Sequence, residues 1–205
     1  MDSSDKKRQA FRFTWPNIIS LFRIAISPVF YFFLISGDNL LVSIGCILFL
    51  VGAYSDYLDG MLARKYHEVT PHGIFIDPLA DKVLTTAAFV AFVQMGIIDL
   101  WMVAIIIVRD FSTTLLRVWG EKADMPIRTS NSAKFKTFLQ MVFIGAILMA
   151  LFLINSFDVG ALKELLGSEI VYYSMLVLTV LTVWTLGEYL ISNRNVIKKL
   201  CSSGK

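Results

Sequence analysis

The chain has 205 residues, of which 56% are hydrophobic and only 17% are charged, and it carries a formal net charge of +3. Its mean hydropathy of +0.66 is too high for a soluble domain of this length. We therefore expect an integral membrane protein with no nucleic-acid partner.

Apolar runs separated by polar breaks predict about six membrane-spanning helices, because a helix needs roughly 20 residues to cross a bilayer. No run has the alternating pattern of a membrane β-barrel strand. The predicted spans are 15–36, 40–62, 75–96, 101–119, 135–155 and 170–191. The predicted fold class is therefore all-α, a polytopic bundle of six transmembrane helices.

The predicted membrane domain covers residues 15–192, between two polar flanks. Residues 1–14 form a basic juxtamembrane segment in which Lys6, Lys7 and Arg8 precede two phenylalanines. This pattern fits a short interfacial helix on an anionic leaflet, and it fits equally well a disordered flank that only sets the topology. Residues 193–205 form the predicted C-terminal tail.

Basic residues set the expected orientation, since they concentrate on the cytoplasmic side of membrane proteins. In the six-span topology nearly all of them fall on one side. On that side lie Lys6, Lys7, Arg8, Arg12, Arg64, Lys65, Lys122, Arg128, Lys134, Lys136, Arg194, Lys198 and Lys199. Lys163 is the single basic residue of the opposite loops. Both termini are therefore predicted to be cytoplasmic.

Four aspartates stand close together at this cytoplasmic edge: Asp56, Asp59, Asp77 and Asp81. A carboxylate near hydrocarbon costs on the order of 3 kcal/mol, so such a cluster needs compensation by cations or solvent. The first two aspartates are i and i+3 on one predicted helix, and the other two are i and i+4 on the next. Together they favour a site for two hard divalent cations, Mg²⁺ or Mn²⁺.

Small and basic residues share the helical stripe of the first two aspartates. Gly60, Ala63 and Arg64 follow Asp56 at i+4, i+7 and i+8. The missing side-chain bulk leaves room for a diphosphate, and the arginine can neutralise phosphate oxygens. Small residues on membrane helices also mark close helix packing, and isolated aspartates at helix ends are usually solvated. The whole constellation favours a site.

The four aspartates, Gly60, Ala63, Arg64 and also Gly73 match all eight fixed positions of the CDP-alcohol phosphotransferase signature. The chain therefore resembles this family. The resemblance implies a six-helix, usually homodimeric membrane enzyme that moves a substituted phosphate from a CDP-linked donor to an alcohol and releases CMP. It assigns the metals to all four aspartates, and it makes Asp81 the general base as well. The donor-binding residues that it implies are Asp56, Asp59, Gly60, Ala63, Arg64 and Gly73.

The acceptor alcohol is predicted from a second set of residues. The chain is similar over most of its length to the bacterial phosphatidylglycerophosphate synthases of the family, which use CDP-diacylglycerol and glycerol 3-phosphate. An acceptor that carries its own phosphate needs an anion site. The candidates are Arg109, Arg117, Lys134 and Lys136, which also fit a role as topology-setting charges.

Two alternatives stay open. The Arg109-Asp110 pair is similar to the eukaryotic-type cardiolipin synthases of the family, for which phosphatidylglycerol is the acceptor; inositol phosphate and serine are further candidates. Intramembrane carboxylates also build ion pathways in transporters. The edge position of the aspartates and the absence of a visible repeat disfavour transport.

Overall fold

The computed structural model describes residues 15–66, 73–122, 125, 127, 130–194, 196 and 197. At residues 15–18, 56–66, 73–79, 81, 121 and 122 it describes the backbone only. The interfacial helix predicted within residues 1–14 and most of the predicted tail lie outside the described residues.

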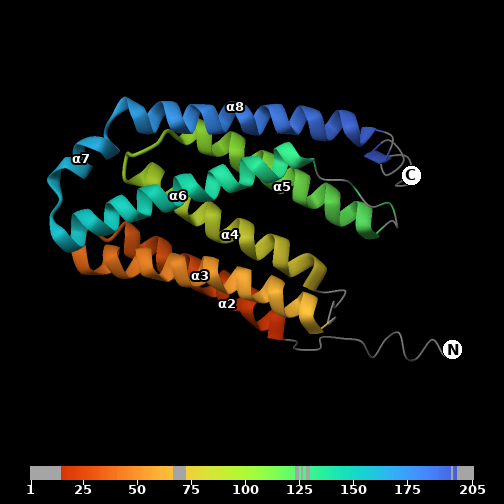
Figure 1. The fold of residues 1–205 in the computed structure, drawn as a ribbon, viewed down its shortest axis with the longest axis horizontal. Helices are drawn as coiled ribbons and strands as arrows, with labels where there is room; N and C mark the ends of the chain where they lie inside the picture. Colours follow the sequence, from red (N-terminus) through yellow and green to blue (C-terminus); the bar gives the residue numbers. More distant parts are fainter. Residues whose placement is uncertain are drawn as a thin grey trace.

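The described residues form seven helices and no strands, which confirms the all-α class. Their bounds are α2 Trp15–Leu34, α3 Asn39–Tyr66, α4 Gly73–Gln94, α5 Leu100–Lys122, α6 Asn131–Phe157, α7 Gly160–Leu166 and α8 Glu169–Ser192. Each of the six long helices overlaps one predicted span, and successive long helices run in opposite directions (Figure 1).

Two features of these helices differ from the sequence prediction. Helix α6 begins at Asn131, four residues before the predicted span, because Ser130 caps it by accepting a hydrogen bond from the Ala133 N–H at 3.2 Å. Hydropathy finds the apolar part of a helix, whereas capping decides where the helix starts. Helix α7, which was not predicted, is a seven-residue helix with no buried residue.

Helix α4 is the central helix of the bundle. It lies between α2 and α3 on one side and α5, α6 and α8 on the other (Figure 1). Ala88, Phe89, Ala91 and Phe92 in its second half are all at most 1% exposed. A helix that is buried on several faces needs apolar residues all round rather than one apolar stripe.

Aromatic contacts connect neighbouring helices through this core. The Phe30 and Phe49 rings, from α2 and α3, have centroids 5.3 Å apart, and Phe89 of α4 stacks on Phe143 of α6 at 6.4 Å. Such pairs contribute about 0.5–1.5 kcal/mol beyond the area that they bury.

The outer surface of the described bundle is rich in large apolar side chains. Phe32 is 62% exposed, and Trp184 and Ile191 are both 72% exposed. Helices α6 and α8 are long and apolar enough to cross a membrane, and α2, α3 and α4 contain shorter apolar stretches. Apolar surface of this extent is typical of contact with lipid. The protein is therefore a membrane protein.

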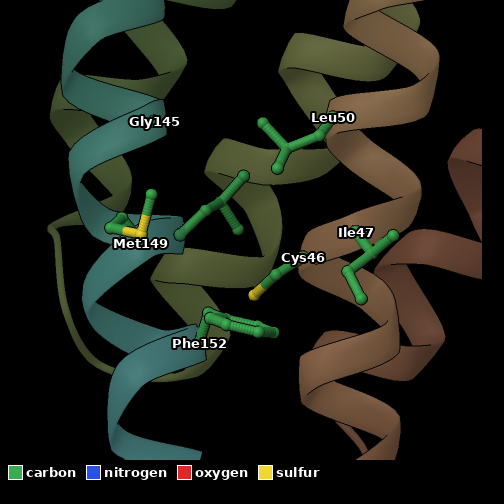
Figure 2. A pocket seen from close by; sticks show the side chains of 7 residues that line it. Cys46, Ile47, Leu50, Gly145, Met149 and Phe152 are labelled. Atoms are coloured by element: carbon green, nitrogen blue, oxygen red, sulfur yellow. The ribbon is translucent and has the colours of Figure 1, made fainter. Parts of the chain in front are cut away.

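A small cavity of about 130 Å³ lies between α3 and α6 (Figure 2). Its lining is apolar and comprises Cys46, Ile47, Leu50, Gly145, Leu148, Met149 and Phe152. A cavity without polar partners suits hydrocarbon and cannot bind a phosphate.

Candidate active site

The four aspartates lie on the backbone where α3 ends and α4 begins. Asp56 and Asp59 fall in the last three turns of α3, and Asp77 and Asp81 fall in the first three turns of α4. The ends of α5 and α8 lie at this same end of the bundle (Figure 1). The helical backbone agrees with the i, i+3 and i, i+4 spacing on which the metal prediction depends. The side chains of these aspartates lie outside the described residues.

The other signature positions also lie in segments of which the structure describes the backbone only. Gly60, Ala63 and Arg64 belong to the helical end of α3, and Gly73 is the first residue of α4. Their side-chain environment is not described. The helical backbone and the carboxylate donor set fit hard divalent cations.

Just before these aspartates, α3 packs closely against α2 and α4. A Cβ added to Gly52 would lie 3.0 Å from the Cδ2 atom of Leu84 and 3.8 Å from the Cγ atom of Arg23. Arg23 is fully buried and Leu84 is 2% exposed, so neither side chain has free space to move into. Gly52 therefore permits the close approach of α3 and α4 one turn from Asp56.

A buried ion cluster includes Lys82, the residue that follows Asp81 on α4. Its centre is Asp110 of α5, whose side chain is 5% exposed. Three cations from three helices surround this carboxylate. Lys136 Nζ of α6 is 2.8 Å from Oδ1 and 3.0 Å from Oδ2, Arg109 Nη1 of α5 is 3.1 Å from Oδ1, and Lys82 Nζ of α4 is 3.5 Å from Oδ2.

Two polar side chains complete the cluster. Lys136 Nζ also donates to Gln140 Oε1 at 2.5 Å, so its three N–H bonds face three acceptor atoms. Arg109 Nη2 donates to Thr185 Oγ1 of α8 at 3.0 Å. Hydrogen bonds that involve charged groups, which are about twice as strong as neutral ones, therefore connect α5, α6 and α8, and the ion pair of Lys82 with Asp110 adds α4.

The structure brings together two of the four residues that the sequence suggested for acceptor phosphate. Arg109 and Lys136 are both buried and both contact Asp110. Lys134 is exposed on α6, and Arg117 lies eight residues farther along α5. In the part of the chain with described side chains, the ion pairs do not join either of them to Asp110.

A model of the CDP-alcohol phosphatidyltransferase family matches residues 13–187. The chain belongs to this family. The match includes α2 to α7 and most of α8, so it covers both the aspartate-bearing helices and the ion cluster. CDP-alcohol phosphatidyltransferases generally use divalent metal ions.

Individual relatives carry more specific names. A Bacillus subtilis protein named CDP-diacylglycerol–glycerol-3-phosphate 3-phosphatidyltransferase is 36% identical over 149 residues, which are 67% of this chain and 77% of the relative. A Haemophilus influenzae protein of the same name is 30% identical over 186 residues, covering 87% and 92%. A Mycobacterium tuberculosis protein named probable phosphatidylglycerophosphate synthase is 33% identical over 138 residues, covering 66% of each chain.

The sequence prediction missed part of the ion cluster around Asp110. Lys82, Gln140 and Thr185 are not among the site residues predicted from the sequence. Thr182, Thr185 and Tyr189 form a buried polar stripe on α8 at i, i+3 and i+7. Polar residues at that spacing in an apolar helix indicate a face that packs against other polar groups.

Proposed function

We propose that the chain transfers the phosphatidyl group of CDP-diacylglycerol to glycerol 3-phosphate, giving phosphatidylglycerophosphate and CMP in phospholipid biosynthesis. The observation that carries this proposal is the pair of buried cations, Arg109 and Lys136, that share the single carboxylate of Asp110. An acceptor with its own phosphate requires such a site, and an uncharged acceptor does not. The relatives' names agree with this acceptor.

In this proposal Asp81 is the general base. It takes the proton from the acceptor hydroxyl while that oxygen forms a bond to the β-phosphorus of the donor. The bond between this phosphorus and the oxygen that bridges to the CMP phosphate breaks, and CMP leaves with the electron pair. Gly60, Ala63 and Arg64 bind the cytidine diphosphate moiety together with Gly73.

Asp56, Asp59, Asp77 and Asp81 hold two divalent cations, Mg²⁺ or Mn²⁺. When bound, such ions neutralise the diphosphate and stabilise the charge that develops on the leaving oxygen. Two observations support this assignment. Carboxylate oxygens are the ligands that hard divalent cations prefer, and the helical backbone spaces the aspartates at i, i+3 on α3 and at i, i+4 on α4.

Arg109, Arg117, Lys134 and Lys136 supply the positive charge for the acceptor phosphate. Two details support Arg109 and Arg117 as donors. The Nε atom of each is buried, and neither Nε has a hydrogen-bond acceptor among the described residues. A buried donor without an acceptor costs about 1–3 kcal/mol, which a bound phosphate oxygen would recover.

The six long helices all span the membrane in this proposal, and the active site opens to the cytoplasm of a bacterial inner membrane. The distribution of basic residues supports this orientation. A homodimer is the expected assembly. Light scattering of the detergent-solubilised protein, corrected for bound detergent, would measure the protein mass directly, and a monomer mass at micromolar concentration would contradict the dimer.

The decisive experiment incubates the purified protein with CDP-diacylglycerol, a divalent cation and one candidate acceptor at a time, and follows CMP. We expect CMP release with glycerol 3-phosphate and much less with phosphatidylglycerol, inositol phosphate or serine. Excess chelator should stop the reaction, and either Mg²⁺ or Mn²⁺ should restore it. Full activity in excess chelator would contradict the metal assignment.

One observation favours a second candidate, cardiolipin synthase. Asp110 follows Arg109 directly, and this pair resembles the eukaryotic-type cardiolipin synthases of the family. Faster CMP release with phosphatidylglycerol than with glycerol 3-phosphate would establish that activity instead.

A further inference from the structure

The apolar cavity of about 130 Å³ between α3 and α6 opens on the outer surface of the bundle. Cys46 and Leu148 form its inner wall and are 3% and 2% exposed. Ile47, Leu50 and Met149 form its rim, and each of them is about half exposed. A hydrocarbon chain from the surrounding membrane can therefore enter from the side, and dispersion contacts with the apolar wall favour its entry.

The cavity is closed toward the end of the bundle that carries α7. There Ser43 Oγ of α3 and Ser156 Oγ of α6 share a hydrogen bond of 3.0 Å. About one turn nearer to the aspartates, Cys46 and Phe152 point toward each other between the two helices (Figure 2). Farther toward the aspartates, α3 and α6 diverge (Figure 1). The hydrogen bond and these two side chains therefore form the floor of the cavity.

Gly145 of α6 keeps the part of the cavity nearest the aspartates wide. A Cβ added to this glycine meets no atom of the described residues within 4 Å, whereas a Cβ on Gly52 would lie 3.0 Å from Leu84. Close packing of helices therefore explains Gly52 and does not explain Gly145. Glycine inside a helix is less favourable than alanine, so the missing side chain at 145 has a cost that helix packing does not require. The open space beside it suits a ligand.

The depth of the cavity along α3 matches the depth of one membrane leaflet. Cys46 and Asp56 are ten residues apart on this helix, which is about 15 Å along the axis. The hydrocarbon core of a bilayer is about 30 Å thick, so the acyl chains of one leaflet extend about 15 Å inward. A lipid whose diphosphate binds at the aspartates therefore has the ends of its acyl chains at the level of the cavity floor.

We propose that the end of one acyl chain of the CDP-diacylglycerol donor binds in this cavity, and that the floor limits the chain length that the donor site accepts. An apolar cavity of about 150 Å³ holds a benzene molecule, so this one holds roughly five carbons of the chain. The remaining carbons run along α3 toward Asp56. This inference rests on the proposed function and names the part of the donor that the cavity recognises.

The test measures CMP release from dipalmitoyl and from dioctanoyl CDP-diacylglycerol in nonionic detergent micelles, and compares the ratio of the two kcat/KM values among variants. The dioctanoyl donor has the same headgroup, but its shorter chains end before the cavity. Gly145→Leu fills the cavity. Ala146→Leu is the matched control, because the neighbouring Ala146 is exposed and lines the groove between α6 and α8 instead. Wild-type turnover of the dioctanoyl donor tests the proposed function, and the ratio tests the inference.

For Gly145→Leu we expect the ratio of the dipalmitoyl to the dioctanoyl kcat/KM to fall about tenfold, the size expected when a large side chain overpacks a filled site. The kcat/KM for the dioctanoyl donor and the KM for glycerol 3-phosphate should both stay within about twofold of wild type. Ala146→Leu should keep the wild-type ratio, because its added side chain lies outside the cavity.

Two results would overturn the inference. An unchanged ratio in Gly145→Leu would mean that only bulk lipid or detergent contacts this cavity. An equal loss of kcat/KM with both donors would mean a general structural defect, which does not depend on chain length. If Gly145→Leu does not fold, Met149→Trp narrows the same cavity from its exposed rim, where a larger side chain is tolerated. That variant should also lower the ratio, and an unchanged ratio would contradict the proposal.

Discussion

Replacing Lys136 by methionine should destabilise the protein strongly. Lys136 is 1% exposed, and its ammonium group is surrounded by Asp110 and Gln140 at 2.5–3.0 Å. Methionine nearly matches its volume, so the change removes the charge without leaving a large cavity. The buried Gln140 Oε1 loses the donor Lys136 Nζ, and Asp110 loses the nearest of the three cations around it.

The expected loss is about 3–5 kcal/mol of unfolding free energy, because breaking a buried pair leaves an unpaired charge and an unsatisfied acceptor. Part of the cost is offset because Lys82 and Arg109 still face Asp110, so we expect the lower end of that range. For a chain of this size, about 3 kcal/mol corresponds to a fall in Tm on the order of 6–12 °C.

The assay is thermal unfolding in detergent micelles, followed by intrinsic tryptophan fluorescence. The matched control is Lys134→Met, two residues away on the exposed side of α6. This substitution should change the unfolding free energy by no more than about 0.5 kcal/mol. Equal shifts for the two variants, or a loss below about 1 kcal/mol for Lys136→Met, would refute a structural role for the buried cluster.

Three further outcomes follow from the structure. Asp81→Asn should abolish most CMP release while metal and CDP-diacylglycerol binding stay largely intact, since the amide oxygen can still face the metals but the amide cannot take the proton; normal turnover would remove Asp81 from the role of base. Gly52→Val should destabilise the protein by about 1–3 kcal/mol, because a Cβ already lies 3.0 Å from Leu84, and an unchanged Tm would contradict the tight packing. Gly145→Ala should instead stabilise it by about 0.5–1 kcal/mol, since a Cβ there meets nothing within 4 Å and alanine favours the helix; a lower Tm would show that the cavity beside it is filled.

The helices could be predicted from the sequence because hydropathy and span length decide them almost alone. Each predicted span overlaps a long helix, although α3 continues four residues past the predicted end, to Tyr66. Those residues carry Arg64 and Lys65, which a hydropathy criterion rejects and a helix tolerates. Helix α7 was missed because a seven-residue surface helix has neither a span's length nor an apolar face.

For the active site, the aspartate spacing could be read from the sequence because it is local: i, i+3 and i, i+4 are properties of single helices. The structure places each pair of aspartates within one continuous helix, as this spacing assumes. The ion cluster joins residues far apart in sequence, such as Asp110 with Lys136 and Arg109 with Thr185. No local spacing encodes such contacts, and the sequence could indicate only that charges in an apolar run need partners. The individual roles of the aspartates and of the basic residues stay predictions.

Helix α7 offers a practical point of attachment. All of its residues are at least partly exposed, and among the described helices it contacts only α6 and α8. It lies at the end of the bundle opposite the end of α5 (Figure 1). Exposed connections of this kind tolerate insertions best. An epitope or a rigid fiducial domain inserted next to Gly167 would add mass for electron microscopy. It would also report, by antibody access in sealed vesicles, which face of the membrane this connection occupies.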